Sequence, residues 1–202
     1  MHIMGEAQRR KAEIEKVSRL YTDWLATLTQ SEREVAQVSM RAHERIVKGK
    51  RLLGACYLLS FFLHQYLKRE KGIETTVVVG WINDGTTPLM ISHAWLEFGG
   101  KKSDITLTHT EHPDAQLTGE LIILEHVVRS GRVKYTYHRQ RSKEAVIALQ
   151  KLREEMPWAV DAKEAEHLQM EEISESEAMI QKYLNAAPDD RNYDALARLL
   201  AN

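Results

Sequence analysis

The chain is almost free of cysteine, with one residue, Cys56, among 202. A single cysteine excludes an intrachain disulfide and any zinc site that is built from several cysteines. A lone cysteine is typical of a small, inert core side chain, but a thiol nucleophile would look the same in a sequence. Cys56 therefore has two interpretations at this point, a buried thiol or a reactive one.

Long apolar runs are also missing. The longest, LLGACYLLSFFL, is too short to span a membrane and continues into HQYLKRE. The first residues, MHIMGEAQRRKAEIEK, lack the apolar core of a signal peptide. We therefore expect a cytoplasmic protein with no membrane partner.

No excess of charge of one sign marks the whole chain, which has 28 Lys and Arg against 29 Asp and Glu. This balance gives no argument for nucleic-acid or membrane binding. The charge is uneven, however: residues 142–202 carry 7 basic and 13 acidic side chains, a net of −6, and the rest of the chain stands at +5. Such a segment is more often a solvated acidic helical tail than a surface that steers a charged partner.

What the sequence does contain begins with helical patterns. An apolar stripe over residues 5–28 predicts an amphipathic helix. Ser31 and Glu34 have capping-box spacing and predict a second helix that runs to about Val47. A third helix, over about residues 55–70 with Gly72 as its stop, is apolar on nearly every face at its start and should be the buried central helix.

Strand signals follow. ETTVVVGW, LMISHAWLEF and KKSDITL read as strands, and ELIILEHVV, RSG and RVKYTYH could supply another hairpin, although the first of these could also be helical. From Ser142 onward the pattern is helical again, interrupted by Pro157 and Pro188. The order predicts an α+β fold in which helices pack on a small antiparallel sheet. We divide it into a helical segment (1–49), a core (50–141) and an acidic helical segment (142–202), all within one compact domain.

The predicted hairpin ISHAWLEFGGKKSDIT carries a histidine and an aspartate where alkyl groups would suit a sheet better. Gly99 and Gly100 favour a two-residue turn, because such turns need positive φ angles. In that register Asp104 lies opposite Trp95, on the same face as His93 and diagonal to it. A carboxylate there can fix the tautomer of the imidazole and stabilise its protonated form. A three-residue turn would separate the pair.

A nucleophile would complete this arrangement. Ser92 projects to the other face of the strand, which leaves Cys56 at the start of the predicted central helix. Unpaired N–H groups and the helix dipole favour a thiolate at such a position. If the first turn of that helix packs against the His93 face, Cys56, His93 and Asp104 form an activated cysteine site.

The stretch GACYLLSFFLHQYLKREKGIETTVVVGW, followed by ISHAWLEFGGKKSDIT, resembles the transglutaminase-like superfamily of papain-fold cysteine enzymes. The likeness is a cysteine opening a buried helix, then HAWLE on a strand, then an aspartate on the next strand, and it covers about residues 50–107. It looks most like the small bacterial transglutaminase-like proteins, a group that includes the leader peptidases of lasso-peptide maturation. The resemblance implies a papain/transglutaminase-like core with N- and C-terminal helical extensions.

The resemblance also implies roles: Cys56 as nucleophile, His93 as general base and Asp104 as orienting carboxylate. The expected activity is hydrolysis of a peptide, protein or small amide through a thioester, and this chemistry needs no cofactor. Papain-like relatives have an oxyanion-hole glutamine six residues before the nucleophile, where this chain has Lys50. The alternatives are acyl transfer, as in transglutaminases or arylamine N-acetyltransferases, and a binding or scaffold protein that has lost the chemistry.

Other candidate residues have plainer interpretations beside the functional ones. Trp95 could form a wall of the active site or simply pack, and Glu97, close to the turn, is expected to be solvated. His109 and His112 have metal-ligand spacing but lie in a predicted loop without a fixed third ligand, so we expect no metal site. The basic run RSGRVKYTYHRQR could touch phosphate, but an edge strand kept soluble by its charges explains it as well, so we expect no nucleic-acid partner.

Overall fold

The computed structural model describes residues 8, 9, 11, 19–110 and 116–201. At its N-terminal end residues 19–27 are helical, and Trp24 and Leu28 pack against the core. The ring of Trp24 stacks on that of His126 with the centroids 4.3 Å apart. The described part of the predicted apolar stripe therefore faces the protein, whereas its first members, such as Ile14, lie outside the described residues.

The next helix, α2 (Gln30–Ala42), continues directly into a π-helix, η1 (His43–Lys48). The prediction that Ser31 and Glu34 cap it was wrong, because Thr29 and Glu32 form the capping box. The Thr29 hydroxyl accepts the Glu32 N–H at 3.3 Å, and the Glu32 carboxylate accepts the Thr29 N–H at 2.9 Å. Both pairs have the same spacing, but Thr29 has the extended backbone of an N-cap whereas Ser31 is already helical.

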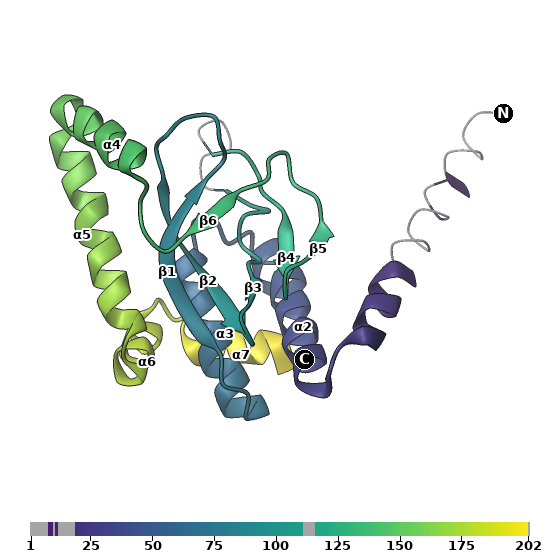
Figure 1. The fold of residues 1–202 in the computed structure, drawn as a ribbon. Helices are drawn as coiled ribbons and strands as arrows, with labels where there is room; N and C mark the ends of the chain where they lie inside the picture. Colours follow the sequence, from purple (N-terminus) through teal and green to yellow (C-terminus); the bar gives the residue numbers. More distant parts are fainter. Residues whose placement is uncertain (1–7, 10, 12–18, 111–115, 202) are drawn as a thin grey trace.

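Helix α3 (Cys56–Lys71) is the buried central helix that the sequence predicts. Phe61, Phe62 and Leu67 are completely buried along it. The helix ends at Gly72, whose φ of +65° is the left-handed conformation that glycine adopts without strain. It contacts β1 and β2 of the sheet and also α2, α6 and α7, so it occupies the middle of the molecule (Figure 1).

The main sheet is antiparallel and curled, with the strand order β3-β2-β1-β6 (Figure 1). Its strands are β1 (Thr76–Asn83), β2 (Ile91–Phe98), β3 (Lys101–Ser103) and β6 (Thr136–His138). Strand β6 comes from the basic run of residues 129–141 and lies at the edge of the sheet, as the edge-strand interpretation of that run requires. Fold class α+β, with helices packed on a small antiparallel sheet, is thus confirmed.

A second, two-stranded sheet corrects the prediction for the segment that follows β3. Strands β4 (Leu121–Ile123) and β5 (His126–Arg129) pair with each other, so ELIILEHVV forms a hairpin by itself. Its turn places Leu124 and Glu125 at φ of 50° and 64°. The predicted pairing of this segment with RVKYTYH was wrong, because β6 in that stretch pairs with β1 instead.

The C-terminal segment consists of α4 (Lys143–Glu155), α5 (Pro157–Ser174), α6 (Glu177–Ala186) and α7 (Tyr193–Ala201). It is more than a solvated acidic tail, since α5 contacts β1, α6 contacts α3, and α7 contacts α2 and α3. Ile180, Leu184 and Leu196 are almost completely buried in the main core. Figure 1 shows α4 and α5 as a helical pair beside the sheet. None of the helices within the described ranges has both the length and the apolar character needed to cross a bilayer.

One carboxylate joins this C-terminal segment to the central helix. Glu177, at the start of α6, accepts hydrogen bonds from His64 at 2.8 Å and from Gln65, and it pairs with Lys68 at 3.0 Å. His64 and Gln65 are buried. The Glu177 side chain itself is 49% exposed, so removing its carboxylate takes a partner from the buried side chains of His64 and Gln65 at the edge of the core.

We expect Glu177→Ala to lower the free energy of unfolding by about 1–3 kcal/mol, the cost of unpaired buried polar groups. Denaturant unfolding followed by circular dichroism measures this difference. Glu172→Ala, which removes an exposed carboxylate on α5, is the matched control and should change stability by less than about 0.5 kcal/mol. Equal effects of the two substitutions would contradict the assignment of Glu177 as the connecting residue.

Candidate functional site

The candidate site begins where α3 begins. Cys56 is the first residue of this helix and is half-buried. The backbone turns into the helix through Gly54, with φ of +62°, and Ala55, the N-cap residue. Ala55 has no side-chain hydrogen bond to cap the helix. No N-cap side chain therefore accepts a hydrogen bond from the first backbone N–H groups of α3. Such N–H groups can stabilise a negative charge at the start of a helix.

The hairpin of β2 and β3 has the predicted register. Phe98 pairs with Lys101, and Gly99 and Gly100 have φ of 57° and 73° in the turn between them. Asp104 continues from β3 as a single bridge to Ile122 of β4, with N–H to carbonyl distances of 2.8 and 3.0 Å. This bridge, together with the preceding pairing of β3 with β2, holds the backbone at Asp104 in place.

His93 and Asp104 are in direct contact. His93 Nε2 and Asp104 Oδ2 lie 2.6 Å apart, and the two residues are only 3% and 2% exposed. The diagonal contact inferred from the two-residue turn is therefore present. Cys56 lies beside His93 in the lining of one cavity, close enough to influence the charge of the imidazole. Because Nε2 is occupied by Asp104, Nδ1 is the ring nitrogen left for a partner on the other side of His93.

Further donors hold the Asp104 carboxylate in place. Oδ1 accepts the N–H of Thr106 at 2.9 Å and its hydroxyl at 2.8 Å, and Oδ2 accepts the hydroxyl of Tyr137 at 2.9 Å. Burial alone would raise the pKa of the Asp104 carboxyl, but the charge of His93 and these hydrogen bonds lower it below its ordinary value. Burial and the nearby Asp104 charge raise the pKa of the Tyr137 hydroxyl, so it stays a donor.

The electrostatics favour a protonated His93. Burial by itself would lower the pKa of this imidazole, but the charge of Asp104 and the interaction with the neighbouring Cys56 outweigh burial and raise the pKa above its ordinary value. At neutral pH the arrangement is therefore an imidazolium between a carboxylate and a sulfur atom. An imidazolium in this place stabilises a thiolate and can later protonate a leaving group.

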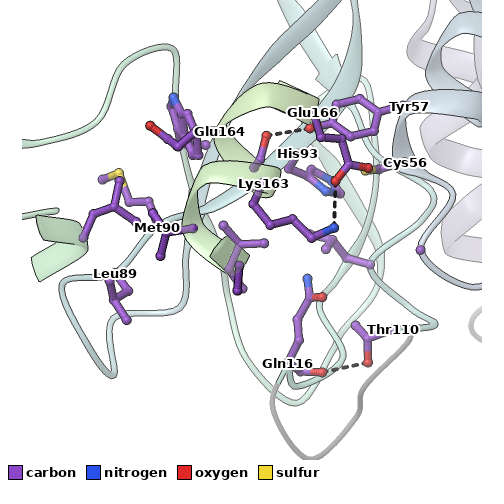
Figure 2. A pocket seen from close by; sticks show the side chains of 18 of the residues that line it. Cys56, Tyr57, Leu89, Met90, His93, Thr110, Gln116, Lys163, Glu164 and Glu166 are labelled. Carbon is purple, nitrogen blue, oxygen red and sulfur yellow. Dashed lines mark hydrogen bonds and ion pairs between the residues drawn. The ribbon is translucent and has the colours of Figure 1, made fainter. Parts of the chain in front are cut away.

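Cys56 and His93 open into a cavity of about 440 Å³ (Figure 2). Its near end contains these two residues, and Leu89 and Met90, from the connection between β1 and β2, lie at the far end of the view. One wall comes from the C-terminal helical segment, including Lys163 of α5. The C-terminal helices thus form part of the surroundings of the candidate nucleophile.

A polar network ties α5 to the strand that carries His93. The hydroxyl of Ser92 lies 2.5 Å from the Tyr57 hydroxyl and 2.5 Å from Nδ1 of His167 in α5. The His167 ring packs on Trp81 with the centroids 3.9 Å apart. Ser92 lines the same cavity as His93, and its hydroxyl is engaged by these two partners.

Sequence reasoning missed several residues of the site, and their signals differ. Thr106 could have been found, because Asp-x-Thr is a local turn pattern in which the hydroxyl and N–H reach back to the carboxylate. Tyr137 could not have been found, because it is 33 residues from Asp104 and its strand was assigned to another hairpin. Tyr57 and His167 give no sequence signal beyond an aromatic and a polar residue on helices.

Trp95 does not form the active-site wall that we considered as one of its two roles. It is 3% exposed, and its ring packs edge-on against Tyr137 with the centroids 5.3 Å apart. Trp81, not Trp95, is among the described residues that line the cavity. Trp95 also crowds Gly80, where a Cβ would come within 2.8 Å of its ring, so its role is packing beneath the site.

Glu97 is paired and not simply solvated, because it accepts Trp95 Nε1 at 3.0 Å and Arg139 at 2.6 Å. Lys50, six residues before Cys56, is exposed and lines a separate surface hollow beside Asp190. The part of the chain that the structure describes contains no cluster of three or more metal-ligating side chains. Of the considered histidine pair, His109 lines the cavity and His112 lies outside the described residues.

The fold and the site together define a class: an α+β domain whose buried helix begins with a cysteine that lines the same cavity as a His–Asp pair. Protein-family models, curated proteins and solved structures give no match to this chain. Function is therefore inferred from the geometry of these residues.

Proposed function

We propose that this chain is a cysteine-dependent amide hydrolase, peptidase-like in its chemistry, with a papain/transglutaminase-like core. The observation that carries the proposal is a thiol at the start of a buried helix that shares a cavity lining with His93, whose ring is hydrogen-bonded to buried Asp104. A purely structural role for His93 would not require both a thiol at the start of a neighbouring helix and a carboxylate whose two oxygens accept hydrogen bonds. The proposed roles are nucleophile, general acid–base and orienting carboxylate.

The proposed reaction starts with the thiolate of Cys56 attacking the carbonyl carbon of an amide. The electron pair of the C=O bond moves to the oxygen, and the N–H groups at the start of α3, including that of Cys56, stabilise the resulting oxyanion. Collapse of this intermediate breaks the C–N bond as His93 gives its proton to the departing amine. A thioester on Cys56 and a neutral His93 remain.

Water completes the cycle. His93 takes one proton from a water molecule, whose oxygen attacks the thioester carbonyl, and release of the acid regenerates the thiolate beside the imidazolium. Asp104 stays ionised throughout and holds His93 with Nδ1 directed at sulfur. Its bonds from Thr106 and Tyr137 keep the carboxylate from rotating.

The rate of alkylation of Cys56 by iodoacetamide between about pH 4 and 10 tests the proposal. We expect the wild type to react well below pH 7, whereas an ordinary thiol becomes reactive only near pH 8.5. His93→Ala should shift the profile up toward that value. Labelling is unambiguous because the chain has one cysteine.

His93→Gln is the matched control for folding, because its amide can still donate to Asp104 but cannot become an imidazolium. It should show the same alkaline profile as the alanine variant. A wild-type profile like that of an ordinary thiol, or identical profiles in wild type and both variants, would overturn the proposal.

A binding or scaffold protein is the second candidate, and one observation favours it. Lys50 stands in place of the oxyanion glutamine and lies away from the cavity, so the described residues contain no counterpart to that donor at its family position. A degenerate site would leave Cys56 unreactive until the protein unfolds.

Acyl transfer to an amine is distinguished from hydrolysis by incubation with acetyl-CoA followed by intact-mass measurement. A stable acetyl adduct on Cys56 would favour an acetyltransferase.

A further inference from the structure

The far part of the cavity is apolar, and it is built by two segments that are distant in sequence. Leu89, Met90 and Ile91 come from the connection into β2. Opposite them, α4 and α5 contribute the apolar residues Leu149, Leu152, Met156, Ala159 and Val160. Figure 2 shows Leu89 and Met90 well separated from Cys56, so the apolar region extends away from the sulfur atom.

Apolar side chains at the edge of this region are in contact with water. Ile91 is 42% exposed and Met156 is 46% exposed. A ligand that covers them gains the free energy of removing apolar surface from water. A cavity of about 440 Å³ lies within the size range of small-molecule sites. The space therefore suits an apolar group larger than a methyl.

The charged side chains of the lining are already paired with one another. Arg141 forms a two-pronged ion pair with Glu164, one contact of which is 2.9 Å. Lys163 pairs with Glu166 at 2.7 Å. The Arg141–Glu164 pair is largely shielded from water, with side chains 15% and 27% exposed, so a charged ligand beside it would have to disturb this pair, and the lining there favours a neutral ligand.

We infer that this cavity binds a neutral, bulky aliphatic or aromatic group adjacent to the scissile amide, which makes the substrate class hydrophobic amides. This inference rests on the proposed function, because it takes Cys56 as the reacting atom. It assigns the C-terminal helices a role in specificity: α4 and α5 form the wall that selects the substrate. The group binds along the apolar region while the carbonyl reaches the sulfur.

The test uses iodoacetamide and its N-ethyl, N-butyl and N-hexyl derivatives, whose alkyl chains extend from the amide nitrogen, on the far side of the carbonyl from the CH₂ carbon that attaches to sulfur. Second-order rate constants for Cys56 are divided by those for glutathione, which removes intrinsic differences between the reagents. We expect the ratio to rise by about threefold per methylene until the cavity is filled, as burial of each CH₂ allows. A ratio that does not change with chain length would overturn the inference.

Substitutions in α4 locate the effect. Leu149→Gln places an amide in the lining and should remove most of the gain with chain length. Ile147→Gln, on the same helix but 60% exposed and outside the lining, is the matched control and should keep it. Thermal unfolding shows whether each variant is folded. If Leu149→Gln does not fold, Ala159→Leu, which fills the cavity, should instead slow the hexyl reagent selectively.

The outcomes separate this inference from the proposed function. Unsubstituted iodoacetamide does not use the apolar region, so its low-pH reactivity reports only the thiolate–imidazolium pair. Reactivity at low pH without a chain-length effect, or an equal loss of that effect in Leu149→Gln and Ile147→Gln, overturns the hydrophobic site and leaves the catalytic proposal standing. An ordinary pH profile with a strong chain-length effect overturns the catalytic proposal and supports the hydrophobic site.

Discussion

Replacing Asp104 by alanine is expected to lower the free energy of unfolding by about 3–5 kcal/mol, because it breaks a buried charged pair by removing one partner. His93 is 3% exposed and would be left without the carboxylate 2.6 Å away. The hydroxyls of Thr106 and Tyr137 would also lose their acceptor. Urea unfolding at pH 6 measures the loss.

The same substitution is expected to abolish the low-pH reactivity of Cys56. Without the charge of Asp104, burial lowers the pKa of His93, so the imidazole is neutral and cannot stabilise a thiolate. Asp104→Asn keeps the shape and an oxygen for Thr106, and should cost less stability while losing the same reactivity. If Asp104→Asn reacts like the wild type below pH 7, the carboxylate is structural and the proposed triad is wrong.

The pH dependence of stability gives a second readout of the Asp104 prediction. The folded-state pKa of His93 is raised above 6.5, so its contribution is complete below about pH 6.5 and is lost as the pH rises through the alkaline folded value. The pKa of Asp104 is lowered below 3.8, so its contribution is present above that value and is lost in stronger acid. The stability difference between wild type and Asp104→Asn should be largest between about pH 4 and 6.5 and shrink on either side.

The positions of the two hairpin residues were predictable because local rules determine them. Gly99 and Gly100 select a two-residue turn, the turn sets the register, and the alternation of a strand places His93 and Asp104 on one face. The start of α3 at Cys56 was likewise predictable from a long apolar segment and its stop at Gly72. Each of these steps uses residues close together in the sequence.

The rest of the site could not be predicted because it depends on which surfaces meet. The apolar face of α4 is visible in the sequence, but nothing there indicates that Leu149 and Leu152 face Met90 across a cavity. The contact between Ser92 and His167 spans 75 residues and depends on how α5 packs against β1. The hydrophobic pattern of a helix identifies its apolar face but not the surface that this face contacts, so the helical wall of the cavity appears only in three dimensions.

Cys56→Ala is expected to fold like the wild type and to lose catalysis by roughly 10⁶-fold, the scale on which removal of a triad nucleophile acts. Cys56 is half-buried, and replacing its sulfur by hydrogen leaves only a small space at the first turn of α3. Hydrolysis of p-nitrophenyl hexanoate measures the loss, because an activated thiolate also cleaves esters and a hexanoyl chain suits the apolar cavity. Thermal unfolding reports the fold.

A control variant decides how the result is interpreted, because Ser92 and His167 form a second hydroxyl–imidazole contact beside the same cavity. Ser92→Ala removes one neutral hydrogen-bonded network and should reduce turnover by about tenfold at most. If Ser92→Ala abolishes turnover and Cys56→Ala does not, the hydroxyl is the nucleophile and Cys56 is not. If Cys56→Ala is strongly destabilised, the thiol is a core side chain, and the proximity of His93 to sulfur is a matter of packing. Loss of turnover in a folded Cys56→Ala protein, with turnover kept in Ser92→Ala, assigns the chemistry to sulfur.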